Sequence, residues 1–448
     1  MTTRTGTLTL TLALAAASAL AGCNSTLTAV PALAPSAASS ADEHFERVLT
    51  VTISPTDTRA SLEARYTGEV VAFHPDAEPP FAILGLAARA NSVGAMAVGD
   101  SNTMTAPENP STATLLGTAA WAGGTAAWAG GTAAWAGVTA AWAGADTSIT
   151  LGQNYGAWSQ IRLDKGQPLA NKLGGGVAVA VIDTGIDTSH PAFVEPNGSS
   201  RLTTNRYDFV DNDNDPNEVG VWGTDVGYGH GTGVAAIVLQ VAPKAKIMAL
   251  RALRPDGSGD VTNVVKAIDW AVAKGAQVIN LSLGTVQNSA IDNEVAYATS
   301  KGVYVVSSSG NTSNQMITTP AKQARVTTTV GNLSVGVGSV STITLDRKSN
   351  FSTYGHALEM TSPGEGIYTA APGAAMATWS GTSFATPMVT GALALALGEL
   401  PRGQQGRLAM NVATQADNVD AVNDSTLAGK LGLGRLNVEK FLRYTLGR

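Results

Sequence analysis

The chain has 448 residues, 44% of them hydrophobic and only 14% charged, so it can bury a large core and form more than one folded segment. Its formal net charge is −6, and nothing in the sequence resembles a nucleic-acid-binding protein, which would need a strongly basic face. Beyond the N-terminus, no apolar run is long enough to span a bilayer.

Residues 1–22 are typical of an export signal, with Arg4 ahead of a short apolar stretch. The stretch ends in Leu20-Ala-Gly-Cys23, and Cys23 is the only cysteine, so no intramolecular disulfide can form. The tetrapeptide resembles a bacterial lipobox, which implies lipidation of Cys23; an ordinary signal-peptidase site with an incidental cysteine is the alternative. We expect a cell envelope lipoprotein or a secreted protein that meets the membrane only through this anchor.

The next two segments precede the main domain. Residues 23–44 are rich in Ala, Ser, Thr and Pro and are expected to be a flexible tether. Residues 45–112 are expected to form a small β-rich region, because Arg47 to Ser54 alternates in polarity and two apolar runs follow, Glu69 to Phe73 and Phe81 to Leu86. The sequence does not distinguish a pro-region from an accessory domain.

Residues 113–150 contain a repeat in which Gly-Thr-Ala-Ala-Trp-Ala-Gly recurs every seven residues, placing Trp121, Trp128, Trp135 and Trp142 in register. Its glycines oppose a stable helix, at about 1 kcal/mol each relative to alanine. We interpret the segment as a low-complexity linker; a segment that docks its indole rings on a partner is the alternative.

Residues 151–448 have the pattern of an α/β domain. Val177 to Ile182, Val278 to Leu283 and Val303 to Val306 are apolar runs that suit buried strands. Val264 to Ala273, Val295 to Ser300 and Thr386 to Leu397 have helical spacing or composition. Strands that alternate with helices predict a doubly wound, mostly parallel sheet with helices on both faces.

Three short motifs in this domain carry residues suited to nucleophilic catalysis. Asp183 ends a predicted buried strand, His230 lies between glycines at the start of an apolar helix, and Ser383 stands in Gly-Thr-Ser-Phe-Ala-Thr-Pro at the start of another. A serine hydroxyl becomes nucleophilic when a base takes its proton, imidazole does this near pH 7, and a carboxylate fixes the imidazole tautomer. Each residue alone has an ordinary structural explanation, but the three together predict a catalytic triad.

These motifs, in the chain order Asp, His, Ser, resemble those of the subtilisin-like serine proteases, or subtilases, over residues 155 to 445. The resemblance implies the subtilisin-like fold, an acyl-enzyme intermediate and an endopeptidase that acts as a monomer on proteins or peptides. It further implies that Asn311, after Ser-Ser-Ser-Gly, donates to the oxyanion together with the Ser383 backbone N–H.

The resemblance also implies a substrate cleft with two backbone edges that pair with an extended peptide. One edge is Gly257, Ser258 and Gly259, and the other is Ser282, Leu283 and Gly284. The wall of the pocket for the side chain before the cut is formed by Ser307, Ser308, Ser309 and Gly310. A turn at Thr319-Pro320 resembles one that carries a cis proline in the family, so we expect a cis bond there.

Asp208, Asp211, Asp213 and Asp215 form an acidic loop between the first two catalytic motifs. Hard oxygen ligands at alternating positions suit Ca²⁺, and the loop resembles a calcium loop of some thermostable subtilases. A solvated acidic turn is the alternative. We expect structural Ca²⁺ at these four residues.

Two other classes of function fit the sequence less well. An inactive, subtilase-like binding module would use the tryptophan repeats, but it has no need of Asp183, His230, Ser383 and Asn311 together. A lipase or esterase would carry its serine in Gly-x-Ser-x-Gly and in the order Ser, Asp, His, which this chain does not. The sequence therefore favours an exported serine endopeptidase.

Overall fold

The computed structural model describes residues 45, 47–86, 98–101, 103–105, 114–115, 154–195, 197–222, 224–285, 288–323 and 333–448. The signal expected at 1–22, the tether expected at 23–44 with Cys23, and the repeat lie outside these ranges. The strands between 98 and 115 are described by their backbone alone.

The centre of the fold is a seven-stranded sheet in which every neighbouring pair of strands is parallel. In β7, Val179 and Val181 join the core on one face, while Ala180 and Ile182 join the core on the other. In sheet order the strands are β14 (Met360–Pro363), β13 (Ser334–Val340), β12 (Tyr304–Ser308), β11 (Val278–Leu281), β7 (Ala178–Asp183), β9 (Lys246–Arg251) and β8 (Tyr207–Asp208).

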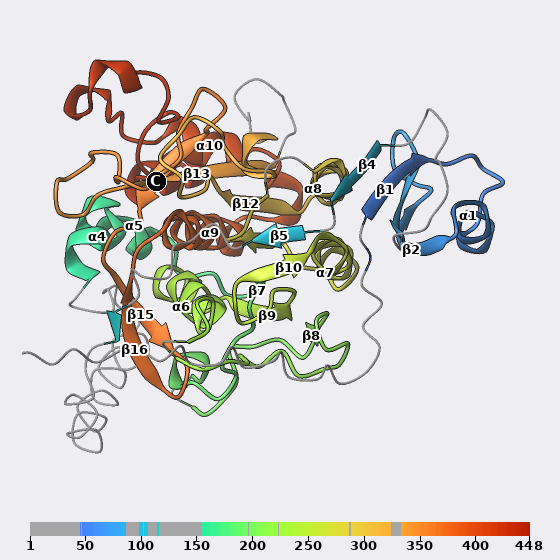
Figure 1. The fold of residues 1–448 in the computed structure, drawn as a ribbon. Helices are drawn as coiled ribbons and strands as arrows, with labels where there is room; N and C mark the ends of the chain where they lie inside the picture. Colours follow the sequence, from blue (N-terminus) through green and yellow to red (C-terminus); the bar gives the residue numbers. More distant parts are fainter. Residues whose placement is uncertain are drawn as a thin grey trace, which may run out of the picture. The chain divides into compact units, whose positions relative to one another are not determined.

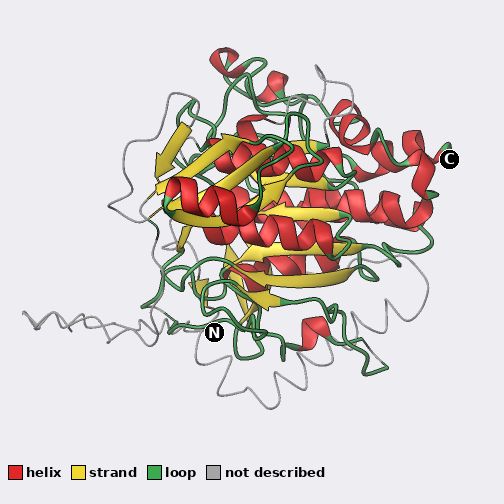
Figure 2. Ribbon diagram, turned by 90° about the vertical axis from the view of Figure 1, so that its right-hand side faces the viewer, coloured by secondary structure: helices red, strands yellow, loops and turns green. Residues whose placement is uncertain are grey.

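Two pairs of long helices cover the two faces of this sheet, as expected for a doubly wound domain (Figures 1 and 2). On one face lie α6 (His230–Val241) and α9 (Thr382–Glu399), and on the other lie α7 (Val261–Ala273) and α8 (Ser289–Ser300). The predicted α/β fold is therefore confirmed. Helix α8 begins earlier than predicted because the Asn288 side chain caps it, accepting from the N–H groups of Ala290 and Ile291.

Shorter elements complete the domain around the sheet. The further strands are β6 (Thr114–Leu115), β10 (Ser258–Asp260), β15 (Ile367–Ala371) and β16 (Ala375–Trp379). The further helices are α4 (Tyr155–Gln160), α5 (Leu163–Gly166), α10 (Leu408–Thr414) and α11 (Val438–Leu446). The 3₁₀ turns are η3 (Gln167–Leu169), η4 (Pro191–Phe193), η5 (Ala321–Gln323), η6 (Arg402–Gln404), η7 (Asp420–Val422) and η8 (Ser425–Leu427).

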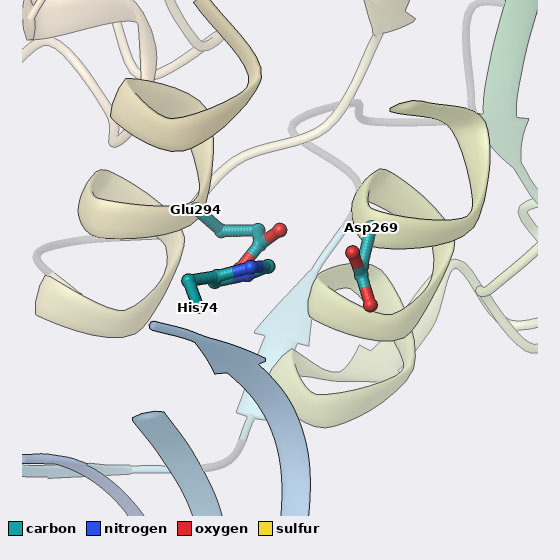
Figure 3. Close-up of side chains that lie close together, drawn as sticks. All are labelled: His74, Asp269 and Glu294. Atoms are coloured by element: carbon teal, nitrogen blue, oxygen red, sulfur yellow. The ribbon is translucent and has the colours of Figure 1, made fainter. Parts of the chain in front are cut away.

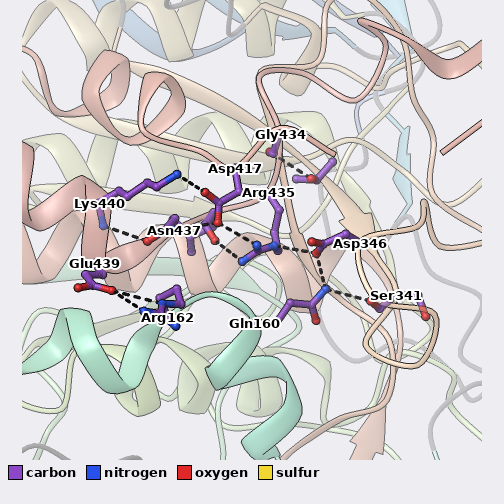
Figure 4. Close-up of polar contacts among 12 residues, drawn as sticks. Gln160, Arg162, Ser341, Asp346, Asp417, Gly434, Arg435, Asn437, Glu439 and Lys440 are labelled. Carbon is purple, nitrogen blue, oxygen red and sulfur yellow. Dashed lines mark hydrogen bonds and ion pairs between the residues drawn. The ribbon is translucent and has the colours of Figure 1, made fainter. Parts of the chain in front are cut away.

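A polar network ties the C-terminal helix α11 to the rest of the domain (Figure 4). Asp417 accepts from Arg435 at 2.9 Å and from Lys440 at 2.6 Å. Glu439 of α11 pairs with Arg162 at 3.0 Å, next to α5. These pairs join the two ends of the domain, which are far apart in the sequence.

The β-rich N-terminal region predicted from three apolar runs is present as an antiparallel sheet in the order β2-β3-β1-β4. Its elements are β1 (Arg47–Thr52), α1 (Arg59–Tyr66), β2 (Gly68–His74), β3 (Phe81–Leu86) and β4 (Val98–Ser101). The short helix α1 was not predicted; a capping box between Thr58 and Ser61 starts it.

The two faces of the N-terminal sheet contribute side chains to different hydrophobic cores. Leu49, Leu62 and Leu84 belong to a local core under α1. Val71 and Ile83 instead share a core with residues of α7 and α8. The N-terminal sheet is therefore packed by one face onto the helices that cover the main sheet.

The peptide bond between Thr319 and Pro320 is cis, as predicted, and a second cis bond joins Glu78 to Pro79. Among the described helices, none has both the length and the apolar composition needed to cross a bilayer.

Candidate active site

Asp183 is the last residue of β7, and its side chain is buried at the carboxyl edge of the sheet. Its Oδ1 accepts from the Thr184 N–H at 2.7 Å and lies 2.6 Å from Nδ1 of His230. A carboxylate bonded to Nδ1 leaves Nε2 as the nitrogen that can accept a proton. The structure thus joins the first two predicted residues in the arrangement of a general base with its orienting acid.

His230 is the first residue of α6, and glycines on both sides let the chain fit there. Gly229 has φ = 90°, a left-handed conformation that glycine adopts without strain. A side chain at Gly229 would meet Pro372 at 2.6 Å, and one at Gly231 would overlap the Gly185 carbonyl oxygen. The Gly-His-Gly motif is therefore a steric requirement for bringing this helix end against the end of β7.

Ser383 lies in the first turn of α9 and is clamped by Ser282, which follows β11. The Ser383 hydroxyl donates to the Ser282 carbonyl at 3.1 Å, and the Ser282 hydroxyl donates to the Ser383 carbonyl at 2.8 Å. Asn280 donates to the Ser282 hydroxyl at 2.9 Å and accepts from Thr390 at 2.7 Å. This chain of hydrogen bonds fixes the start of α9 relative to β11.

Phe384, the residue after Ser383, brings the serine segment against the histidine. Its ring centroid lies 5.3 Å from that of His230, with the rings nearly perpendicular. Because α6 and α9 also share one core, all three predicted residues gather at one edge of the sheet. Parallel strands end at this edge, where α/β domains bind their ligands.

Asn311 follows β12 and is held by the residue before Ser383. Its Oδ1 accepts from the Thr382 backbone N–H at 2.9 Å and from the Thr382 hydroxyl at 3.0 Å. With Oδ1 occupied in this way, the amide NH₂ group is the part of the side chain available to donate to a ligand. The predicted neighbourhood of Asn311 and Ser383 is present in the structure.

The expected substrate-cleft residues lie around these groups, and most of their side chains are buried. Ser282 and Leu283 are fully buried, and Ser308 and Ser309 donate to the carbonyls of Leu283 and Thr353. Side-chain burial leaves the backbone as the part of these segments that can pair with a peptide.

One of the two expected edges already pairs with a segment of the same chain. Strand β10, which contains Ser258 and Gly259, pairs antiparallel with β5 (Thr103–Thr105), and Gly259 lies opposite Met104. Gly257 precedes this strand with φ = 79°. The chain ahead of the main domain therefore contributes an added strand at the place expected for substrate.

The acidic loop differs from the four-carboxylate calcium site that the sequence predicted. An arginine from another strand pairs with two of its four aspartates. Arg251 of β9 contacts Asp208 at 2.5 Å and Asp211 at 2.6 Å through the same Nη1. The other oxygen of Asp208 accepts from two backbone N–H groups of the loop. Asp208 is thus already satisfied within the protein, and Asp213 and Asp215 are the two exposed carboxylates that remain for an ion.

Glu218 lies beside the candidate triad, a position that the sequence did not predict. Its Oε1 accepts from the Thr232 N–H and hydroxyl, both at 3.1 Å, and from the Thr184 hydroxyl at 3.3 Å. Burial raises the pKa of Glu218 to about 7, and the charge of Asp183 adds to this shift. Glu218 follows the acidic loop in sequence, and its local pattern does not predict this position, because the side chain turns inward only in the tertiary structure.

Known proteins resemble this chain over most of its main domain. The family model described as the subtilase family matches residues 174–434. Thermitase of Thermoactinomyces vulgaris is 36% identical over 282 residues, which cover 60% of this chain and 90% of thermitase. Subtilisin Savinase of Lederbergia lenta is 35% identical over 280 residues, covering 60% of this chain and 92% of that protein.

One solved structure is described as the crystal structure of a cold adapted subtilisin-like serine proteinase. It is 32% identical to this chain and covers 58% of this chain and 92% of its own, with a TM-score of 0.49.

Glu218→Gln is expected to remove a pH-dependent loss of stability. The folded-state pKa of Glu218, about 7, lies above its ordinary value of 4.5. The stabilisation by the neutral acid is therefore complete below about pH 4.5 and is lost as the pH rises through 7. Thermal unfolding of the variant and of the native chain should agree near pH 5, and the variant should be more stable by about 1–3 kcal/mol at pH 8.

Glu365→Gln, at a half-exposed carboxylate, is the control and should leave the pH dependence unchanged. If native chain and Glu218→Gln keep a constant difference from pH 5 to 8, Glu218 does not titrate in this range. Both proteins should be compared in the same inactive background to avoid self-digestion.

Proposed function

The chain belongs to the subtilase family and is a serine-type endopeptidase, and we propose that Asp183, His230 and Ser383 form its catalytic triad. The observation that carries the assignment is the 2.6 Å contact of His230 Nδ1 with Asp183, next to the serine segment. All three residues come from one chain, so the proposed triad is complete within a monomer. The substrates are proteins or peptides.

In this mechanism, Ser383 Oγ attacks the carbonyl carbon of the scissile bond while His230 Nε2 takes the hydroxyl proton. The tetrahedral intermediate then breaks its C–N bond, and His230 gives the proton to the leaving amine. Water repeats the sequence on the acyl-enzyme and releases the second product. Asp183 remains ionised and stabilises the imidazolium formed in each step.

The negative oxygen of the intermediate needs hydrogen-bond donors that are already in place. The Asn311 amide and the Ser383 backbone N–H are the proposed donors, and the contacts of Thr382 with Asn311 support this role. Because the Thr382 N–H and hydroxyl hold Oδ1, the amide does not have to reorient when charge develops. Such preorganisation acts on the transition state more than on bound substrate.

Ser383→Ala is expected to abolish casein cleavage, because it removes the proposed nucleophile.

Asn311→Ala is expected to lower kcat by about 10²–10³ with little change in KM, the size of effect known for loss of one oxyanion donor in subtilisin. The serine reagent phenylmethylsulfonyl fluoride should inactivate the native enzyme, since it modifies the nucleophilic oxygen. Ser425→Ala, far from this site in the sequence, serves as the control. Full activity of Ser383→Ala contradicts the triad, and no cleavage by the native chain favours an inactive binding module.

We further propose that residues 45–112 are a pro-region that blocks the cleft until the enzyme cuts itself. The pairing of β5 with β10 supports this, since it occupies an edge that an extended substrate would use. An added strand from the same chain needs no second molecule to bind, so it competes strongly with substrate. The alternative, an accessory domain, has no need to enter the cleft.

Self-cleavage is expected between about residues 100 and 158. The intact mass of the purified native enzyme should correspond to a new N-terminus in this range, whereas Ser383→Ala should keep its full N-terminal region. Ser425→Ala should be processed like the native enzyme. Identical masses for native enzyme and Ser383→Ala contradict self-cleavage.

We still propose that the acidic loop binds a structural Ca²⁺, but with fewer carboxylate ligands than the sequence predicted. Asp213 and Asp215 would hold it with neutral oxygens of the loop, while Arg251 keeps Asp208 and Asp211. Ca²⁺ supplies positive charge there and takes no part in the reaction. A ligand that binds only the folded state stabilises it by about 2.7 kcal/mol at a hundredfold excess over Kd.

The melting temperature of the Ser383→Ala protein is expected to rise with millimolar Ca²⁺ and to fall with EDTA. The double variant Asp213→Asn, Asp215→Asn should lose most of this response. The double variant Asp420→Asn, Asp424→Asn, at acids of another surface turn, is the matched control. An unchanged response in the loop variant assigns any calcium effect to another site.

Export and lipid attachment at Cys23 are also proposed, on the sequence of the N-terminal segment alone. The location is then the cell envelope or, without the anchor, the medium. The tryptophan repeat is proposed to act as a linker between the pro-region and the main domain.

A further inference from the structure

A second cluster of chemically active side chains lies where the N-terminal sheet packs on the main domain. His74 ends β2, Asp269 belongs to α7 and Glu294 to α8. One ligand atom from each lies within 4.8 Å of the other two. Figure 3 shows the carboxylates of Glu294 and Asp269 pointing toward each other beside the His74 ring.

The cluster is enclosed at His74 and Glu294, and one Glu294 oxygen has no hydrogen-bond partner among the described residues. His74 is 2% exposed and Glu294 is fully buried. Glu294 Oε2 lies 3.0 Å from His74 Nε2, but no group in the described part of the chain hydrogen-bonds to Oε1. A buried carboxylate oxygen without a donor is costly in free energy, so the geometry favours a cation or a hydrogen-bond donor at this oxygen.

The surrounding charges do not supply that partner. Within the described ranges, neither Glu294 nor Asp269 forms an ion pair with a lysine or arginine. Lys301 pairs with Asp76 at 2.6 Å, and Arg59 donates to the Val70 carbonyl. Two carboxylates therefore face a single imidazole in a buried space.

The imidazole itself is held in one orientation. Its ring stacks on Tyr297, with centroids 3.6 Å apart, and packs against Phe81 at 4.9 Å. The His74 ring is fixed and the Glu294 carboxylate is buried. The half-buried Asp269 is therefore the residue that must move if all three are to bind one ion. Ligand atoms around a tetrahedral ion with bonds of about 2.0–2.1 Å lie about 3.3 Å apart, so binding requires the Asp269 carboxylate to move closer to His74 and Glu294.

We propose that His74, Asp269 and Glu294 bind a divalent transition-metal ion of the Zn²⁺ type, with a fourth position for water. One imidazole nitrogen and two carboxylates are a donor set that suits Zn²⁺ better than Ca²⁺ or Mg²⁺, which prefer oxygen ligands alone. The ion would neutralise both acids and use the Glu294 oxygen that lacks a partner. This inference does not depend on the assignment of the triad.

The competing occupant of the cluster is a proton. A metal must displace it, because metal ligands bind in their unprotonated forms.

The three proposed ligands join the N-terminal region to the main domain. His74 belongs to the N-terminal region, whereas Asp269 and Glu294 belong to helices of the main domain. Metal bound by all three favours the docked arrangement, and docking in turn raises the metal affinity by the same factor. If residues 45–112 are a pro-region, as proposed above, the ion retains it after the cut.

The test is Zn²⁺ titration of the full-length Ser383→Ala chain against a competing chromophoric chelator, with millimolar Ca²⁺ present to fill calcium sites. We expect one Zn²⁺ per chain at this site, and binding at least about tenfold weaker in Ser383→Ala, His74→Gln and in Ser383→Ala, Glu294→Gln. Co²⁺ in place of Zn²⁺ should give the visible absorption of a four-coordinate site, and this absorption should be lost with His74→Gln.

Ser383→Ala, His356→Gln is the matched control, since it removes an exposed histidine elsewhere, and it should bind as the parent does. If the His74 variant is not folded by circular dichroism, Ser383→Ala, Asp269→Asn at the edge of the cluster replaces it. Equal Zn²⁺ binding by parent and cluster variants overturns the proposal, as does absence of binding. Binding that is lost in Ser383→Ala, His230→Ala and kept with His74→Gln assigns the ion to the triad and overturns it as well.

Discussion

The close packing of α6 on α9 is the constraint on which the site depends. The helices approach each other at Gly391, where a side chain would meet the Cβ of Val241 at 2.5 Å. At their N-termini, the same packing brings Phe384 against His230. Because His230 and Ser383 are first-turn residues of these two helices, their proximity follows from backbone packing and does not rely on flexible loops.

The strands supply the other half of the arrangement. Asp183 and Ser282 stand at or just beyond the carboxyl ends of neighbouring strands, where each meets one of the helix N-termini. The Ser282–Ser383 hydrogen bonds and the Asp183–His230 contact then fix each helix start to its strand. Helix N-termini also present free N–H groups and a positive dipole, which suit the negative charge that develops during peptide hydrolysis.

Two glutamates, Glu218 and Glu294, have buried carboxylates in the folded chain. Glu218 lies next to the proposed triad, and Glu294 of α8 contacts His74 of the N-terminal sheet. Burial is the main cause that raises the pKa of each glutamate to about 7. Each has one oxygen without a hydrogen-bond partner among the described residues. Buried groups of this kind are costly in free energy, which is why both are candidates for a role in proton or metal linkage.

The sequence alone determined the fold class and the chemistry, because both depend on local patterns. Short stretches of sequence are enough to predict the buried strands, the apolar helices and the glycines around His230 and Ser383. The cis bond at Thr319 followed from the family resemblance. Tertiary structure decided what depends on distant partners. Arg251 could not be recognised as the cation that pairs with Asp208, since the two lie on adjacent parallel strands far apart in sequence. For the same reason, only the tertiary structure shows the pairing of β5 with β10, the inward turn of Glu218 and the contact of His74 with Glu294.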